Sequence, residues 1–259
     1  MKPRIAIPVP TSTDIPYNGR AWPAYATAIT RSGGEPIQID LTASPAQILE
    51  IARTCQGVCL PGSPADVDPG RYGADRDPAT DPADPARESA DNILLEDAAD
   101  HAKPVLGICY GLQSLNVWRG GSLIQDLTPL PVNHAAGSSV AIAHTALIAE
   151  NSLLASLLGP TEAPDTGGFL RLPINTSHHQ SVSSPGDGLR IVARCPDDGV
   201  VEAVENDPIW PSEAGPQFLL GVQWHPERSY DISPASRALF NRLIAEAAKL
   251  ASNAKLASN

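Results

Sequence analysis

The stretch that decides the fold is Pro104-Val105-Leu106-Gly107-Ile108-Cys109-Tyr110-Gly111-Leu112-Gln113. An apolar strand is predicted to run into a cysteine with glycine two residues before it and two residues after it, and a helix-like segment follows. This is the form of a nucleophile elbow, best known from Gly-x-Ser-x-Gly. The glycines let neighbouring backbone approach closely, and the helix N-terminus favours a thiolate and offers N–H groups to an oxyanion. Cys109 is therefore the candidate nucleophile.

The other three cysteines lack this frame. Free cysteines are commonly buried as small hydrophobic residues, and Cys59 within Gly57-Val58-Cys59-Leu60 fits that role. Cys55 and Cys195 have no elbow either, and the glycine frame alone leaves an unreactive, buried Cys109 open as the alternative. The cysteines form no CxxC pair and no export signal is recognised, so we expect reduced thiols in a cytoplasmic protein.

Around the elbow, expected strands alternate with expected helices. Single helices between strands imply right-handed crossovers and a mostly parallel sheet that is covered on both faces. The fold class is therefore α/β. The expected strands are Arg4–Val9, Glu35–Asp40, Gly57–Leu60 and Pro104–Ile108, and the expected helices lie around Arg20–Ser32, Pro45–Thr54 and Glu88–His101.

The second half of the chain predicts antiparallel strands. Asp197-Asp198-Gly199 lies between the apolar segments Leu189–Ala193 and Val200–Val204, which is a strong hairpin signal. Phe218–Trp224 is expected to be a further strand, and a closing helix is expected from about residue 234. We expect a single domain over residues 1–250, a flexible C-terminal tail over 251–259 and a long polar loop over 63–87.

Composition excludes several classes of protein. The chain has 259 residues, of which 42 % are hydrophobic and 18 % charged, and these globular values rule out global disorder. No apolar run reaches the length of a membrane span. The formal net charge of -11 and a pI near 4.9 argue against a surface for nucleic acid or anionic membranes.

A second chemical motif lies far downstream, in Gly221-Val222-Gln223-Trp224-His225-Pro226-Glu227. His225 and Glu227 are two residues apart at a strand end, so their side chains point to one face. A carboxylate beside an imidazole fixes its tautomer and supports the imidazolium, as in Cys–His–acid arrangements. A surface His–Glu pair is the alternative, and the apolar strand before His225 and the elbow upstream favour the catalytic interpretation.

Together the segments 107–113 and 223–227 resemble the class I glutamine amidotransferase family. Further stretches narrow the resemblance to the γ-glutamyl-γ-aminobutyrate hydrolases and their relatives, peptidase family C26. These stretches are Leu60–Ser63 with Asp68-Pro69 and Tyr72-Gly73, Asn116-Val117 with Gly120–Asp126, Asn175–Gln180, and Asp198–Ala203. They cover nearly the whole chain in family order, and they imply a flavodoxin-like, mostly parallel sheet flanked by helices.

The resemblance implies a role for each matched residue. Cys109 would be the nucleophile, His225 the base and acid, and Glu227 the residue that orients His225. The oxyanion hole would use backbone N–H groups of Gly62 or Ser63 and of Tyr110, and the glutamyl pocket would use Gln113, His178, His179 and Gln180.

One matched position departs from the family pattern. Tyr110 stands where the hydrolases usually carry Arg after the nucleophile. The lost positive charge predicts a shift away from anionic leaving groups. The alternative is that the side chain of residue 110 points away from the leaving group and only its backbone N–H matters.

His178 and His179 also raise the question of a metal. Adjacent strand residues point opposite ways, and no nearby Cys or acid completes a ligand set, so no metal is expected. A pair that only hydrogen-bonds locally and a wall of the glutamyl pocket both stay open. The Asp-rich run from Asp66 to Asp84 lacks the ligand spacing of a calcium loop.

These observations predict a cysteine hydrolase that cleaves the γ-glutamyl amide bond of a small γ-glutamyl amine through an acyl-enzyme. It would release glutamate and the amine without a cofactor, and the resemblance implies a place in polyamine catabolism. The expected partner is the small-molecule substrate, with no nucleic acid and no membrane, and a homodimer stays open. The alternatives are the glutaminase component of an amidotransferase and a non-catalytic binding protein on the same fold.

Overall fold

The computed structural model describes residues 2–128, 130–209 and 217–257. Within these residues the strands form a nine-stranded sheet and a two-stranded sheet. In spatial order the large sheet contains β2 (Glu35–Ile39), β1 (Arg4–Pro8), β3 (Gly57–Leu60), β4 (Val105–Ile108), β11 (Leu219–Val222), β10 (Val201–Asn206), β9 (Leu189–Arg194), β6 (His144–Ala149) and β7 (Phe169–Ile174). The small sheet pairs β5 (Ser122–Ile124) with β8 (Ser181–Ser184).

The direction of strand pairing divides the large sheet. From β2 to β11 all neighbours are parallel, and from β11 to β7 all neighbours are antiparallel. The predicted α/β class, with parallel strands first and antiparallel strands in the second half, is confirmed. The predicted hairpin is also confirmed as the pair β9–β10.

The register of β4 against β11 places the two sequence motifs side by side. Ile108 lies opposite Val222, and the two strands are parallel. The segments that follow these strands, which begin with Cys109 and Gln223, therefore leave the sheet at the same edge. This is the edge where ligands bind in open α/β sheets, at the carboxyl ends of the strands.

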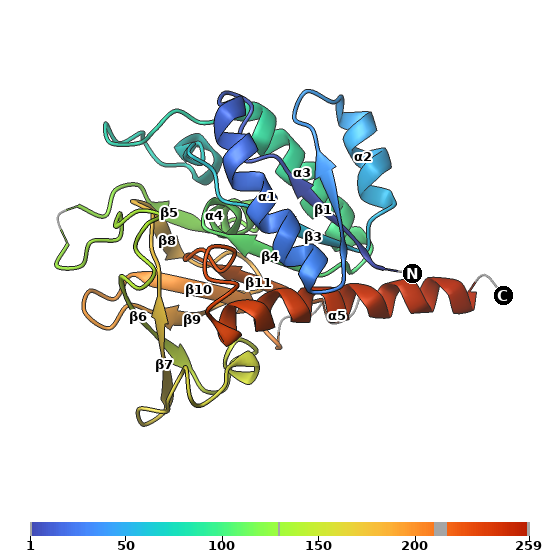
Figure 1. Cartoon of the computed structure of the whole chain (residues 1–259). Coiled ribbons are helices and arrows are strands. Elements are labelled where there is room, and N and C mark those ends of the chain that lie inside the picture. Colours follow the sequence, from blue (N-terminus) through green and yellow to red (C-terminus); the bar gives the residue numbers. More distant parts are fainter. Residues whose placement is uncertain (1, 129, 210–216, 258–259) are drawn as a thin grey trace.

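Helices cover both faces of the sheet (Figure 1). One apolar cluster joins the sheet to α1 (Ile15–Arg31) and α5 (Pro234–Ala257). A second cluster, on the opposite face, joins it to α2 (Pro45–Arg53), α3 (Pro85–Asp100) and α4 (Tyr110–Trp118). Strand β1 shows how the alternation of side chains divides the core, because Ile5 and Ile7 belong to the first cluster and Ala6 to the second.

Several expected boundaries differ from the structure, and helix α1, for example, begins at Ile15 and not near Arg20. The segment expected as a loop over 63–87 contains a short 3₁₀ helix, Pro69–Tyr72, and the first turn of α3. Helix α3 begins at Pro85 because the side chain of Asp84 caps it and accepts the N–H of Arg87 at 3.1 Å. Helix α5 runs on to Ala257, so residues 251–257 of the expected tail continue the helix backbone. A flexible tail and a single domain over 1–250 stay predictions.

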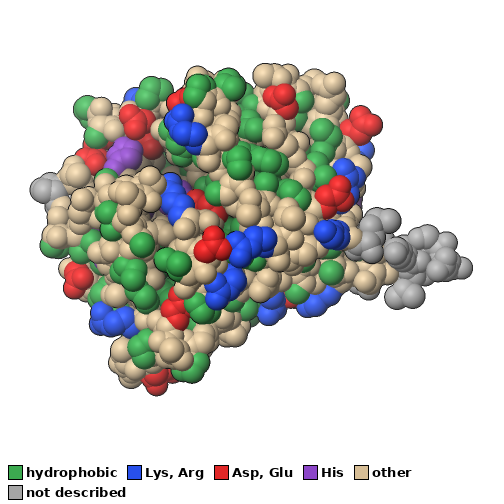
Figure 2. Space-filling view, viewed as in Figure 1, with side chains coloured by type: hydrophobic (Ala, Val, Ile, Leu, Met, Phe, Trp, Pro, Cys, Tyr) green, Lys and Arg blue, Asp and Glu red, His purple; other side chains and the backbone are tan. Residues whose placement is uncertain are grey.

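None of the helices in the described residues is long and apolar enough to cross a membrane. On the face shown in Figure 2, Lys and Arg side chains lie next to Asp and Glu side chains, so no single basic patch dominates that face.

Candidate active site

Cys109 lies between β4 and α4 in a backbone conformation that L-residues rarely adopt. Its φ and ψ are 53° and -110°, and its N–H donates to the carbonyl oxygen of Val222 in β11 at 2.8 Å. Such a conformation costs of order 1–3 kcal/mol and persists only where the surrounding structure enforces it. The strand, the strained cysteine and the following helix have the geometry of a nucleophile elbow, as the sequence predicted.

The two flanking glycines allow this turn to form. A Cβ on Gly107 would lie 2.7 Å from the carbonyl oxygen of Gly111. A Cβ on Gly111 would lie only 2.1 Å from the carbonyl oxygen of Leu60 in β3. Neither contact is sterically acceptable, so the spacing of glycine around Cys109 has a direct packing cause.

His225 and Glu227 form a buried pair beside the elbow. The Nδ1 atom of His225 lies 2.7 Å from Oε1 of Glu227, and both side chains are 3 % exposed. A Cβ on Gly62 would lie 2.9 Å from Cε1 of His225 and 3.6 Å from Cβ of Cys109, so the imidazole and the thiol flank the same glycine. The structure thus brings the three predicted catalytic residues together.

The backbone of His225 is held by a residue that sequence reasoning did not single out. Asn175 donates from Nδ2 to the carbonyl oxygen of His225 at 2.9 Å and accepts the His225 N–H on Oδ1 at 2.9 Å. Both hydrogen bonds are buried, so they fix the position of the His225 backbone that carries the imidazole. Asn175 opens the matched stretch 175–180, and its paired amide donor and acceptor could have indicated this role.

The charges of the pair reinforce each other. Burial alone lowers the pKa of His225, but the Glu227 carboxylate and then Cys109 outweigh it and raise the pKa to about 9. Burial raises the pKa of Glu227, and the charge of His225 and its hydrogen bond outweigh that effect and lower it. His225 therefore carries its proton at neutral pH, which suits it to donate a proton to a leaving amine.

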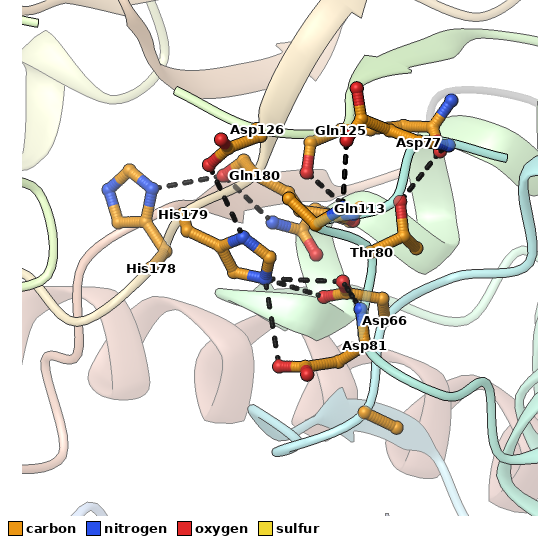
Figure 3. Close-up of polar contacts among 12 residues, drawn as sticks. Asp66, Asp77, Thr80, Asp81, Gln113, Gln125, Asp126, His178, His179 and Gln180 are labelled. Atoms are coloured by element: carbon orange, nitrogen blue, oxygen red, sulfur yellow. Dashed lines mark hydrogen bonds and ion pairs between the residues drawn. The ribbon is translucent and has the colours of Figure 1, made fainter. Parts of the chain in front are cut away.

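A cavity of about 190 Å³ opens beside Cys109. Most of the predicted site residues meet there. It is lined by Ser63, Pro64, Ala65, Asp66, Asp81, Cys109, Tyr110, Gln113, Ser177, His178, His179 and Gln180. Figure 3 shows how Gln113 lies in its wall, where Nε2 donates to the carbonyl oxygen of Gln180 at 3.1 Å.

The predicted oxyanion donors are not equivalent. The Gly62 N–H already donates to the Tyr25 hydroxyl at 3.1 Å. Tyr110 is the first residue of α4, where helix geometry provides no acceptor within the helix for its N–H. Ser63 and Tyr110 both line the cavity. The structure therefore favours Ser63 over Gly62 as the partner of Tyr110.

The two adjacent histidines differ in their surroundings. His178 is buried, with Nδ1 3.0 Å from the carbonyl oxygen of Gln180. His179 is partly exposed at the rim of the cavity, with Nε2 3.1 Å from Asp66 and 3.9 Å from Asp81. Figure 3 shows the two rings pointing to opposite sides, as expected of neighbours in an extended segment. The carboxylates at this rim were not predicted, because the Asp-rich segment was expected to be solvated loop.

The side chain of Tyr110 is 1 % exposed, and its ring faces the guanidinium of Arg87 at 4.8 Å from the ring centroid. Arg87 is fully buried, pairs with Asp91 at 2.7 Å, and donates to the carbonyl oxygens of Pro10 and Pro61 at 2.9 and 2.7 Å. The phenol is thus packed into the wall. This burial favours the alternative in which the backbone of residue 110 matters more than its side chain.

The sequence of the chain matches those of known proteins over most of its length. Residues 13–227 match the family model Peptidase C26. The γ-glutamyl-γ-aminobutyrate hydrolase PuuD of Escherichia coli K12 is 34 % identical over 229 residues, covering 85 % of this chain and 83 % of that protein. A putative glutamine amidotransferase of Mycobacterium tuberculosis is 34 % identical over 210 residues, covering 80 % of this chain and 62 % of that protein.

Solved structures share the fold at much lower identity. A putative GMP synthase protein from Thermoplasma acidophilum superposes with a TM-score of 0.63 at 12 % identity, over 98 % of both chains. The glutaminase domain of Trypanosoma brucei CTPS with bound acivicin gives a TM-score of 0.61 at 16 % identity, over 96 % of this chain and 94 % of that chain. By its sequence match and its fold, the chain belongs to the peptidase C26 family of class I glutamine amidotransferase-like hydrolases.

Proposed function

We propose that this chain hydrolyses the γ-glutamyl amide bond of a small γ-glutamyl amine, with Cys109, His225 and Glu227 as a catalytic triad. The observation that carries the proposal is the meeting, around Gly62, of a buried His–Glu pair and a strained elbow cysteine that itself lines a cavity. The identity to a γ-glutamyl-γ-aminobutyrate hydrolase supports the reaction class. The four free cysteines support a reducing, cytoplasmic setting.

The proposed reaction has two halves. The Cys109 thiolate attacks the γ-carbonyl carbon, and the oxyanion that forms accepts hydrogen bonds from the N–H groups of Ser63 and Tyr110. His225 then gives its proton to the departing nitrogen as the C–N bond breaks, leaving a γ-glutamyl thioester and a free amine. In the second half His225 takes a proton from water, the hydroxide attacks the thioester, and glutamate leaves as the thiolate is restored beside the imidazolium.

The charge of the cavity rim affects which amine is the preferred leaving group. Asp66 and Asp81 are lining residues, and Asp126 lies 3.7 Å from Nδ1 of His179. The hydrogen bond to Asp66 raises the pKa of His179, burial opposes this effect, and the charges of Asp66, Asp81 and Asp126 add to it. Even with a proton on His179, three carboxylates around one imidazole leave the rim with a net negative charge. Like charge at a partly desolvated rim disfavours an anionic amine such as γ-aminobutyrate. We therefore infer neutral or cationic amines as the preferred leaving groups.

To test this, the purified chain is incubated with each of a panel of γ-glutamyl amides. Acid quench traps the acyl-enzyme, and intact mass spectrometry measures its mass. The expected result is a γ-glutamyl adduct on Cys109 and turnover of γ-glutamyl alkylamides and diamines, with γ-glutamyl-γ-aminobutyrate slower. An adduct on another residue, or no adduct with any amide, contradicts the proposed function. The Asp81→Asn variant is expected to reduce the discrimination against the anionic substrate, and an unchanged ratio contradicts the inference about the amine only.

The glutaminase component of an amidotransferase is the second candidate, because the solved structures of like fold include a glutaminase domain. The same experiment separates the two. A glutaminase would form its adduct fastest from glutamine, and added synthase would stimulate turnover. A stand-alone hydrolase is expected to favour substituted amides and to need no second protein.

A further inference from the structure

A second cluster of titratable side chains lies outside the cavity, where three imidazoles converge on one carboxylate. Glu202 Oε1 is 3.4 Å from Nδ1 of His134, 3.5 Å from Nε2 of His144 and 4.0 Å from Nε2 of His178. The four side chains are between 0 % and 4 % exposed. They come from distant parts of the sequence: the loop after β5, the start of β6, the β7–β8 loop and β10.

Each imidazole uses its other nitrogen to donate a hydrogen bond. Nδ1 of His144 faces the carbonyl oxygen of Thr145 at 3.2 Å, and Nδ1 of His178 faces that of Gln180 at 3.0 Å. Carbonyl oxygens only accept, so these nitrogens carry the hydrogen and leave a lone pair on Nε2. Nε2 of His134 likewise faces the Asp198 carboxylate at 2.9 Å, which leaves the lone pair on Nδ1.

With one hydrogen on each ring, at the nitrogen that faces away from Glu202, the three nitrogens that face Glu202 are acceptors, and so is the carboxylate. Within the described residues, Nδ1 of His134, Nε2 of His144 and of His178, and both oxygens of Glu202 have no hydrogen-bond partner. Burying this many unpaired acceptors is costly unless something positive lies among them.

The spacing also distinguishes a metal ion from a shared proton. A direct N–H···O hydrogen bond spans about 2.7–3.2 Å, which is shorter than any of the three distances to Glu202. Ligand atoms around a tetrahedral zinc ion with bonds near 2.0–2.1 Å lie about 3.3 Å apart. The ligand atoms of His134, His144 and Glu202 all lie within 4.8 Å of one another. The contact from His134 to Asp198 matches the carboxylate–histidine–zinc arrangement of outer partners.

We propose that His134, His144 and Glu202 bind one zinc ion in a buried, structural site. Two imidazole nitrogens and one carboxylate oxygen suit zinc, and Nε2 of His178 lies beside them, 4.0 Å from Oε1 of Glu202. The ion would stabilise the wall of the cavity indirectly. His178 precedes His179 and Gln180 in that wall, and the carbonyl oxygen of Glu202 accepts the N–H of Gln223, two residues before His225.

The test uses the untagged full chain expressed with added zinc, passed through EDTA-containing buffer, and analysed by inductively coupled plasma mass spectrometry. We expect one zinc per chain in the wild type, and little in Glu202→Gln and His144→Gln. His101→Gln, at an exposed histidine, and Asp81→Asn, at the cavity rim, are the matched controls and should keep the ion. The ligand variants should unfold at a Tm lower by about 5 °C or more, since bound metal stabilises only the folded chain.

A second measurement needs only the wild type, in case the ligand variants do not fold. Zinc K-edge absorption should show four nitrogen or oxygen neighbours with imidazole scattering and no sulfur. The proposal is overturned by a wild type that retains no zinc after expression and refolding with zinc, by sulfur in the coordination shell, or by equal zinc content in Glu202→Gln. It makes no use of the proposed reaction, so failure of one leaves the other standing.

Discussion

Replacing Glu227 by Gln keeps the shape of the buried pair and removes its charge. In the wild type the pKa of His225 rises from 6.5 to about 9, although burial alone would lower it. That shift corresponds to about 3 kcal/mol in favour of the imidazolium. The Glu227 carboxylate is the largest contribution that raises the pKa, so in Glu227→Gln burial should dominate and the pKa of His225 should fall below 6.5.

The sign of the pH dependence follows from this shift. A raised pKa in the folded chain stabilises it fully below the unfolded value of 6.5, and the contribution is lost as pH rises from 6.5 to about 9. The wild type should therefore exceed Glu227→Gln in free energy of unfolding by up to about 3 kcal/mol near pH 6, and the difference should shrink toward pH 9. At pH 7.5 kcat/KM should fall about 100-fold in Glu227→Gln, which is the same energy expressed as a rate.

Urea unfolding at several pH values and the ¹⁵N shifts of the His225 ring measure these quantities directly. Glu246→Gln, at a partly exposed helix pair with Lys249, is the control and should show neither effect. His225→Ala should lose more activity than Glu227→Gln, about 10⁴-fold, because it removes the proton carrier itself. A His225 ring that titrates at the same pH in wild type and Glu227→Gln would refute the argument, as would equal activity of His225→Ala and wild type.

Three further predictions concern the elbow. Cys109→Ser should abolish turnover by several orders of magnitude while Cys59→Ala, inside β3, retains it, as steady-state rates and mapping of iodoacetamide adducts would show. Gly111→Ala should lower the free energy of unfolding, measured by urea titration, by about 3 kcal/mol or more, because its Cβ would lie 2.1 Å from a backbone oxygen of β3. Its control is Gly19→Ala, at an exposed position of α1, where an added Cβ meets nothing within 4 Å and should be neutral or stabilising by up to about 1 kcal/mol. Tyr110→Arg should leave the ratio of kcat/KM for γ-glutamyl-γ-aminobutyrate to that for a neutral γ-glutamyl alkylamide unchanged, because the side chain of residue 110 is packed into the wall against Arg87, and a tenfold rise would contradict this placement.

The sequence was sufficient for the parallel half of the sheet and for the residues around Cys109. Short apolar strands bounded by glycine and helix caps are local signals, and β3 begins and ends as predicted. The strands β6 and β7 were not predicted. β7 lies at the edge of the sheet, is half exposed, and contains Pro173, so neither burial nor propensity marks it.

The residues around His225 show where local reasoning stops. The pairing of His225 with Glu227 follows from their spacing, but the contact with Asn175 depends on how distant segments pack. The expectation of no metal rested on the adjacent pair of histidines alone. His134, His144 and Glu202 approach one another only in the folded chain, because Glu202 lies 68 positions after His134.

The fully buried Arg87 makes the loops at the carboxyl end of the parallel strands depend on one another. A single guanidinium contacts the chain after β1, through Pro10, and the chain after β3, through Pro61, while it also contacts Asp91 of α3 and the ring of Tyr110 in α4. A segment that detaches takes one contact away from the buried guanidinium, which is costly at a site that solvent does not reach. This end of the sheet should therefore open as one cooperative unit, and amide hydrogens in all four segments should exchange with solvent at a common rate.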